Sequence, residues 1–293
     1  MTHQISNNHV KIEVKSKGAE LCSLKKTNES LEYIWQADAK YWNRHAPILF
    51  PIVGKLIDDE YVYEKNNYSL SQHGFARDCD FELVSQTSDT LCFKLSENES
   101  TLEKYPFYFD LFISYKLMEN RLKVSYEVRN NSKKTMYFSI GAHPAFNWSL
   151  ENISEESSNK DEYYFEFEDT NNLERLPLTN MGIKKEIQNI KLEENKLYIN
   201  EELFKDDALV IQNLKNKTIT LKNNIDNRYI KMDFEGFEYS GLWSKPSGAD
   251  FVCIEPWHGV ADFIEHDKNI KNKIGIKSLE ENEIFESEYY IEI

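Results

Sequence analysis

Apolar and polar residues alternate along much of this chain, which is the pattern of strands that bury one face. Residues 10–14 and 91–95 alternate strictly, and 107–117 and 121–128 are longer candidates separated by Met-Glu-Asn, a hairpin loop by its length and content. Further strand candidates are 135–139, 163–167, 218–221, 229–234, 239–243, 251–254 and 284–291. The pattern predicts a chain dominated by antiparallel strands.

Helical signals are short and few. Residues 100–103 and 200–204 each fit a single capped turn, and the chain shows neither strand–helix–strand alternation nor a glycine-rich phosphate loop. We therefore predict an all-β fold, a large sandwich of antiparallel sheets with a few short helices. We expect the polar segment 151–161 to be an exposed loop that interrupts one domain spanning residues 1–293.

Composition and charge narrow the possible functions. Of the 293 residues, 40% are hydrophobic and 29% are charged, enough for a sizeable core and a soluble surface. The formal net charge of −15 and a pI near 5.0 would repel a phosphate backbone, so nucleic acid is not an expected partner. The N-terminus lacks the features of a signal peptide, and no apolar run approaches the roughly 20 residues of a membrane span. These observations predict a cytoplasmic protein with no membrane partner.

Sequence spacing gives no sign of a metal site. The four cysteines are scattered and form no C-x-x-C pair, which indicates neither a zinc knuckle nor a redox pair and favours buried reduced thiols. The histidines are far apart in the sequence, and no H-E-x-x-H or carboxylate-rich loop occurs. We expect no bound metal.

The first candidate for chemistry is His143, in the stretch Ile-Gly-Ala-His-Pro-Ala-Phe-Asn at 140–147. It follows the strand-forming run 135–139, so we expect a histidine at the end of a strand. Pro144 has a fixed φ and favours an extended backbone at His143, which points the ring off the sheet. The alternative is a core or loop histidine bound to a backbone carbonyl.

A second histidine lies in Gln-His-Gly-Phe-Ala-Arg-Asp at 72–78. The glycine after His73 allows a close approach of backbone, and Arg77 can bind a ligand oxygen or hold a carboxylate. The alternatives are a turn histidine at His73 and a salt bridge from Arg77 to Asp78 or Asp80.

The third candidate is Glu255, which directly follows the apolar run 251–254. A carboxylate after a buried strand is costly unless it has partners or a function. Trp257 could stack its face on a sugar ring, although such a tryptophan can equally belong to the core. With His73 and His143, Glu255 offers an acid, a base and a polar clamp for one small polar substrate.

Residues 44–56 form an apolar, proline-containing stretch with cations near both ends, which is typical of a loop or edge that lines a pocket. Arg44 and Lys55 are these cations. Lys55 could reach a hydroxyl or an anionic group of a ligand, or remain a solvated surface lysine.

Three short motifs occur in a fixed order along the chain. They are His-Gly-Phe-Ala-Arg at 73–77, Gly-Ala-His-Pro-Ala-Phe at 141–146 and Ile-Glu-Pro-Trp at 254–257. In this order they resemble the aldose 1-epimerase (galactose mutarotase-like) family, and most of all its LacX-like bacterial branch. The likeness runs from the region of Trp35 to the C-terminus, so it covers nearly the whole chain.

The resemblance implies a single β-supersandwich domain whose concave face binds a free aldose without a cofactor. By the same resemblance, Glu255 is the general base on the C1 hydroxyl, His143 is the general acid on the ring oxygen, and His73 contacts the sugar near that oxygen. Ring opening, rotation about C1–C2 and reclosure then exchange the α and β anomers. A matched acid and base are each typically worth ~10² to 10⁴ in rate.

The chain also departs from the galactose mutarotase pattern. Those enzymes place an arginine on the sugar where this chain has Val-Gly-Lys-Leu at 53–56, so Lys55 takes that place without a bidentate contact. Asp207 is the candidate for the family's sugar-binding aspartate, with Asp206 beside it making a solvated acidic loop the alternative. Arg77, Trp257 and Arg44 complete the predicted substrate-binding set.

Two other functions fit the same fold. A hexose-6-phosphate mutarotase would use Arg44, Lys55 or Arg77 for the phosphate. A non-catalytic carbohydrate-binding or regulatory protein would keep the fold without turnover, but binding alone does not need both a histidine and a glutamate at the catalytic places. We expect an isomerase that acts on a small aldose, as a monomer or a homodimer.

Overall fold

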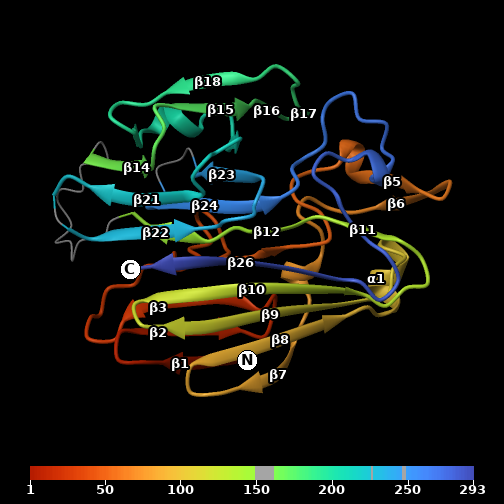
Figure 1. Cartoon of the computed structure of the whole chain (residues 1–293), viewed down its shortest axis with the longest axis horizontal. Coiled ribbons are helices and arrows are strands. Elements are labelled where there is room, and N and C mark those ends of the chain that lie inside the picture. The colour runs from red at the N-terminus through yellow and green to blue at the C-terminus, as the bar shows by residue number, and fades with distance from the viewer. Residues whose placement is uncertain (149–161, 226, 246–248) are drawn as a thin grey trace.

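The computed structural model describes residues 1–148, 162–225, 227–245 and 249–293, and these are mostly β-strands. In order across the larger sheet, the strands are β19 (Lys196–Tyr198), β14 (Tyr163–Phe167), β21 (Thr218–Asn223), β22 (Tyr229–Asp233), β26 (Ile284–Glu292), β10 (Arg121–Asn130), β9 (Phe109–Met118), β8 (Thr90–Ser96) and β7 (Glu82–Gln86). Figure 1 shows β26, β10, β9 and β8 side by side across the lower half of the molecule. The predicted all-β fold of large antiparallel sheets is confirmed.

Alternation in the sequence becomes alternating burial in this sheet. Leu111, Ile113 and Tyr115 of β9 are buried, while the residues between them are partly exposed. β9 and β10 pair from Met118 with Arg121 outward, which leaves residues 119–120 as the turn. The predicted hairpin is therefore confirmed, with Met118 belonging to the strand.

The smaller sheet carries the candidate residues. In order, its strands are β18 (Gln188–Lys191), β15 (Asn172–Leu176), β20 (Leu209–Gln212), β23 (Tyr239–Trp243), β24 (Phe251–His258), β12 (Ile140–Ala142) and β4 (Ile48–Leu49), and β13 (Ala145–Asn147) also pairs with β24. Every residue of β24 is buried. This strand lies in the upper half of Figure 1 between β23 and β12.

β24 is longer than the sequence indicated. The predicted strand ended at residue 254, but β24 continues through Glu255 and Pro256 to His258. One edge of β24 pairs with β13 at Phe251–Cys253 and with β12 at Trp257–His258, so no assigned strand pairs along that edge between them. A proline, which lacks an N–H donor, is tolerated where a partner strand is interrupted.

The remaining elements are short. They are β1 (Thr2–Ser6), β2 (Val10–Lys15) and β3 (Glu20–Lys26) in an N-terminal sheet; the pairs β5 (Glu60–Tyr63) with β6 (Asn66–Ser69), β11 (Met136–Phe138) with β25 (Lys277–Leu279) and β16 (Leu178–Thr179) with β17 (Gly182–Ile183); helix α1 (Glu99–Lys104); and the 3₁₀ helices η1 (Ile57–Asp59), η2 (Ala76–Asp78), η4 (Glu201–Phe204) and η5 (Ile270–Asn272). The two predicted helical turns correspond to α1, which Asn98 caps, and to η4, which Asn200 caps.

Buried apolar side chains from the three sheets form one continuous cluster, with Ile12, Leu111 and Ile254 as examples. All four cysteines are free thiols, of which Cys22 and Cys253 are buried and the other two are partly exposed. The expected loop at 151–161 lies outside the described residues. Among the residues that are described, no helix has the length and apolar character needed to cross a membrane.

Candidate active site

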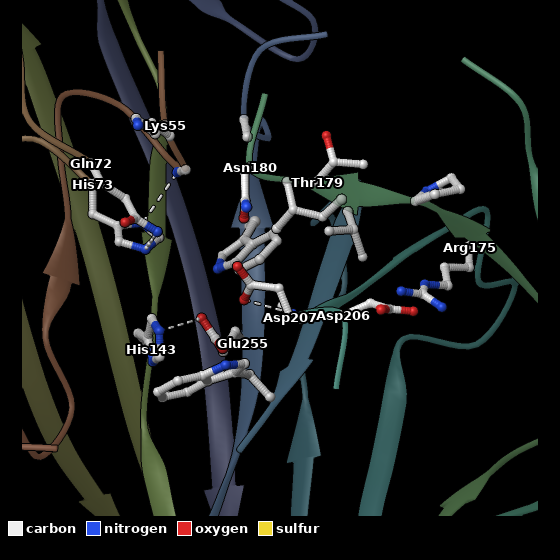
Figure 2. Close-up of a pocket in the computed structure, with 18 of the residues that line it drawn as sticks. Lys55, Gln72, His73, His143, Arg175, Thr179, Asn180, Asp206, Asp207 and Glu255 are labelled. Atoms are coloured by element: carbon white, nitrogen blue, oxygen red, sulfur yellow. Dashed lines mark hydrogen bonds and ion pairs between the residues drawn. The ribbon is translucent and has the colours of Figure 1, made fainter. Parts of the chain in front are cut away.

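A large cavity opens beside β24. Its volume is about 1150 Å³, and its lining comes from β24, β23, β20, β18, β16 and β15 and from loops of both the first and second halves of the chain. Figure 2 shows His73 and His143 on one side, Asp207 and Arg175 on the other, and Glu255 between them. The fold therefore brings together the three motifs that are far apart in the sequence.

His143 and Glu255 face each other across the gap in the sheet. Gly141 pairs with Trp257, and Ala145 pairs with Cys253, so one register runs through both pairings and places residue 143 opposite residue 255. His143 Nε2 lies 3.2 Å from Glu255 Oε2, and the Glu255 side chain is only 1% exposed. This contact could not be predicted from sequence spacing, because it depends on the break between β12 and β13.

The polar atoms of this pair are largely unsatisfied. Among the residues that the structure describes, neither carboxylate oxygen of Glu255 nor Nδ1 of His143 has a hydrogen-bond partner. Buried polar atoms are almost always hydrogen-bonded in folded proteins, so a group of open ones on a cavity wall indicates a place where a ligand supplies the partners.

Burial sets the protonation state of the pair. Loss of solvation, aided by the negative charge of Asp207, raises the pKa of Glu255 well above its ordinary value. Burial also lowers the pKa of His143 to about 3. Both shifts favour the uncharged forms of the pair, the protonated acid and the neutral imidazole, over the ion pair.

His73 is held next to this pair with a defined tautomer. Its ring centroid lies 5.5 Å from that of His143 at an interplanar angle of 87°. The backbone N–H of Gly54 donates to His73 Nδ1 (3.1 Å), so the proton of the neutral ring is on Nε2. Burial, and after it the charges of His143 and Arg77, keeps the pKa of His73 well below its ordinary value. His73 is thus a neutral donor through Nε2.

The backbone around His73 explains the glycine that follows it. A Cβ added at Gly74 would lie 2.3 Å from the carbonyl oxygen of Phe50, and the φ of Gly74 is +71°. The expected close approach of backbone is therefore present. His73 itself has a φ of 67°, an uncommon value for a residue with a side chain.

An aromatic cluster fixes the ring of His143. The Trp42 indole stacks on His143 with centroids 4.9 Å apart and on Phe251 with centroids 5.5 Å apart. Both stacked contacts hold the Trp42 indole, which also lines the cavity. Trp243 meets the His143 ring edge-on at 5.7 Å. The sequence analysis missed these two tryptophans, because no local pattern connects residues 42 and 243 to the motifs.

Trp257 packs tightly against its neighbours and also lines the cavity. Its Nε1 donates to the carbonyl of Ala142 (3.2 Å), and it lines the cavity although it is only 5% exposed. The ring lies against backbone, since a Cβ added at Gly241 would be 2.5 Å from ring atoms Cζ2 and Cη2. Trp257 is therefore a packed residue that also forms part of the cavity wall, and its stacking on a sugar ring stays a prediction.

Gly241→Ala is expected to weaken sugar binding, because the added methyl group would force the Trp257 ring out of its place on the wall. Such overpacking costs at least about 1 kcal/mol. Titration calorimetry with a sugar and thermal unfolding measure the two effects. Ser240→Ala is the control, since Ser240 is buried in the same strand and should change neither value. Unchanged sugar affinity in Gly241→Ala would contradict the assigned position of Trp257.

The structure places two of the three predicted cations, Lys55 and Arg77, on the cavity wall and the third, Arg44, away from it. Every predicted site residue except Arg44 lines the cavity. The Arg44 guanidinium instead donates to Asp78 Oδ1 (2.9 Å). Arg77 lines the cavity but is held by the carbonyl of Gln72 (2.6 Å) and by Asp78 (3.9 Å), so the predicted salt bridge is also present. Lys55 is exposed on the cavity wall.

A buried ion pair anchors the loop that carries Lys55. Lys273 Nζ lies 2.9 Å from Asp262 Oδ1, and both side chains are 1% exposed. Asp262 accepts a hydrogen bond from the N–H of Ile57, and its own N–H donates to the carbonyl of Lys55. Two buried charges are stable only when each has hydrogen-bond partners. The pair therefore holds residues 55–57 firmly against the segment that follows β24.

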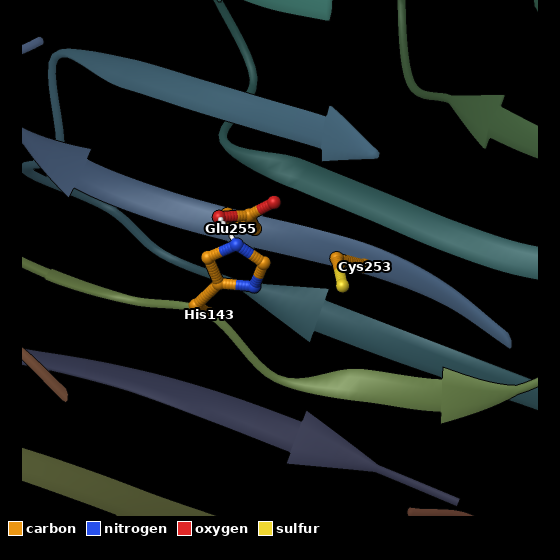
Figure 3. A group of neighbouring side chains, drawn as sticks. All are labelled: His143, Cys253 and Glu255. Atoms are coloured by element: carbon orange, nitrogen blue, oxygen red, sulfur yellow. Dashed lines mark ion pairs between the residues drawn. The ribbon is translucent and has the colours of Figure 1, made fainter. Parts of the chain in front are cut away.

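One group of possible metal ligands lies at the same place. One ligand atom each from His143, Cys253 and Glu255 lies within 4.8 Å of the others (Figure 3). Burial, and after it the charge of Glu255, raises the pKa of the Cys253 thiol well above its ordinary value, and the pKa of Glu255 is raised as well. A cation would need both groups ionised, so this environment favours the protonated side chains over a ligand set.

The fold and this site together define a galactose mutarotase-like protein. The chain belongs to the aldose 1-epimerase family, whose model matches residues 1–275. It is 30% identical over 282 residues to the chromosomal LacX protein of Lactococcus lactis subsp. lactis, covering 93% of each chain.

Solved structures agree with this assignment. A galactose mutarotase related enzyme from Lactobacillus acidophilus superposes with a TM-score of 0.91 at 34% identity, covering 100% of this chain and 97% of that one. A galactose mutarotase-like protein from Lactobacillus casei gives a TM-score of 0.90 at 30% identity, covering 100% and 99%. The resemblance stated from the three motifs is confirmed.

Proposed function

We propose that this protein is an aldose 1-epimerase that interconverts the α and β anomers of a hexose. The observation that carries the proposal is the buried pair of His143 and Glu255 on the wall of a cavity. In the described part of the chain, the carboxylate oxygens of Glu255 and Nδ1 of His143 have no hydrogen-bond partner. Opening a hemiacetal requires a base that removes one proton and an acid that supplies another. A glutamate and a histidine on the same cavity wall can fill these two roles.

The proton count of the pair suits the reaction. Transfer of the acid proton of Glu255 to His143, 3.2 Å away, gives a carboxylate and an imidazolium. The carboxylate takes the proton from the C1 hydroxyl, C1 becomes a carbonyl carbon as its bond to the ring oxygen breaks, and the imidazolium donates its proton to that oxygen. The pair then has the neutral form that burial favours. After rotation about C1–C2, His143 recovers the proton from the hydroxyl and Glu255 returns one to the carbonyl oxygen. No proton is gained or lost over the cycle.

The neighbouring side chains have supporting tasks in this proposal. His73 donates from Nε2 to the sugar near the ring oxygen, and Trp257 presents its ring to the apolar face of the sugar. Lys55 and Asp207 bind hydroxyl groups at the cavity wall. Trp42 keeps the imidazole of His143 in place through ring stacking.

Proton NMR in D₂O tests the reaction class. We expect the protein to accelerate exchange between the α and β signals of glucose or galactose with no deuterium entering at C1 or C2, because only hydroxyl protons move. Deuterium at C2 would indicate an aldose–ketose isomerase or a 2-epimerase and would contradict the proposal. Sugar binding without faster exchange would indicate a carbohydrate-binding protein.

A further inference from the structure

The cavity has the opposite charge to the molecule as a whole. The chain carries a formal net charge of −15. The cationic side chains that line the cavity are Lys55, Arg77, Arg175, Lys184, Lys205 and Lys245, against the carboxyl groups of Asp206, Asp207 and Glu255. Local charge decides what a cavity attracts, so this lining favours an anion.

Four of these six cations have no counter-charge among the residues that the structure describes. Lys205 forms an ion pair with Glu202, and Arg77 is held by Gln72 and Asp78. For Lys55, Arg175, Lys184 and Lys245, the described part of the chain provides no ion-pair partner. The Nε of Arg175 is moreover buried without a hydrogen-bond partner there. An unpaired guanidinium with a buried donor is suited to binding an oxyanion.

Three of the unpaired cations belong to the wall away from His73, which we call the outer wall and define as Arg175, Lys184 and Lys245. Figure 2 shows Arg175 on the side opposite His73 and Lys55. The backbone N–H of Lys184 donates to the carbonyl of Pro177, which brings it to the strand that carries Arg175.

The pairing of β20 with β23 places Lys245 in the same region. Leu209 pairs with Leu242, so the residues after Trp243 run beside the segment 205–208 that leads into β20. Among the described residues, neither Asp206 nor Asp207 of this segment forms an ion pair with the outer wall, although Figure 2 shows Asp206 beside Arg175. Asp207 acts on Glu255, whose pKa its charge helps to raise, and its Oδ1 accepts a hydrogen bond from its neighbour Ala208.

The cavity is also larger than one hexose requires. Its volume of about 1150 Å³ exceeds the ~300–1,000 Å³ of ordinary small-molecule sites. A sugar with C1 at Glu255 therefore leaves room for a further group on the side of the outer wall.

We propose that the outer wall binds an oxyanion carried by the substrate, so that the preferred substrate is an aldose with a phosphate ester or a carboxylate on the carbon farthest from C1. This inference rests on the proposed anomer exchange at Glu255. It differs from the sequence-based alternative of a phosphate at Arg44, Lys55 or Arg77. The guanidinium groups of Arg44 and Arg77 already hold Asp78, and Lys55 lies on the side of the cavity opposite Arg175.

Anomer exchange of glucose, glucose 6-phosphate and glucuronate tests the outer wall. We expect kcat/KM to be roughly tenfold or more higher for at least one anionic sugar than for glucose, since charge-assisted hydrogen bonds are worth that much in affinity. A preference for glucose 6-phosphate alone identifies a phosphate site, and a preference for both identifies a general oxyanion site. The preference should decrease at high salt. Equal kcat/KM for all three sugars would overturn the inference while leaving the proposed function intact.

The variant Arg175→Gln/Lys184→Gln/Lys245→Gln should bring the ratio of anionic to neutral sugar close to one. Lys185→Gln is the matched control, because Lys185 is adjacent in sequence but pairs with Glu265 and is 70% exposed. If no sugar is turned over, the proposed function fails, and calorimetry with glucose 6-phosphate decides the inference separately. Binding that is tighter than for glucose and lost in the triple variant supports it; equal or absent binding overturns it.

Discussion

Glu255→Gln is expected to lower the rate of anomer exchange by ~10² to 10⁴ while sugar affinity changes little. The amide has nearly the same shape as the carboxyl group but cannot take the proton of the C1 hydroxyl. Exchange rates from NMR and dissociation constants from calorimetry separate the two effects. A parallel loss of affinity and rate would indicate a structural task for Glu255 instead.

The partner residue gives a sharper form of this test. His143→Asn should cause a loss of similar size, and the double variant should lose little more than either single one, because the two groups transfer protons in one step. Additive losses would mean that His143 and Glu255, although 3.2 Å apart, act independently.

Glu255→Gln is also expected to raise the free energy of unfolding, by about 1–3 kcal/mol near pH 8. The pKa of Glu255 is raised well above its ordinary 4.5, so above that pH the folded chain keeps a proton that the unfolded chain releases. Stability of the wild-type protein therefore falls as the pH rises through this window, and a neutral glutamine removes that loss. Denaturant titrations over pH 4–8 should show the gain shrinking toward the acid end.

Glu238→Gln is the matched control, and we expect it to change the free energy of unfolding in the opposite direction. Burial disfavours ionisation of Glu238, but hydrogen bonds from His258 and Lys277 outweigh it and lower its pKa to about 2. Its ionised form therefore stabilises the fold above pH 4.5, and the variant should lose stability at neutral pH, with the loss disappearing as the pH falls toward 2. Two glutamates that both contact a histidine but shift stability in the same direction would contradict this account of burial.

The titration of His143 does not affect the comparison of wild type with Glu255→Gln. Its pKa is lowered from 6.5 to about 3, so the unfolded chain binds the extra proton first and stability falls as the pH drops through that window. Both wild type and Glu255→Gln carry this effect. It therefore cancels from the difference between them.

Much of the strand framework could be predicted from local pattern. The candidates at 163–167 and 239–243 match β14 and β23 residue for residue, because the aromatic residues there favour strands and meet a core on at least one face. The end of β24 could not be predicted in this way. A proline at 256 argues against a strand unless the partner strand is known to be interrupted there.

The site was predictable in part for a similar reason. The motifs around residues 73, 143 and 255 carry strong local signals, and the structure brings them to one cavity. The stacking of Trp42 on His143 and the outer wall depend on contacts between segments that are distant in the sequence. Arg175 lies in β15, whose sequence shows no alternation of apolar and polar residues, and Lys184 follows the two-residue strand β17.

Polarimetry of freshly dissolved α-D-glucose and α-D-galactose, with and without the protein, tests the central claim most directly. The account predicts that the optical rotation reaches the same final value faster with protein, and that Glu255→Gln returns the rate to the uncatalysed one. If neither sugar nor its 6-phosphate changes rotation faster with the wild-type protein, the His143–Glu255 pair is not an anomerase site.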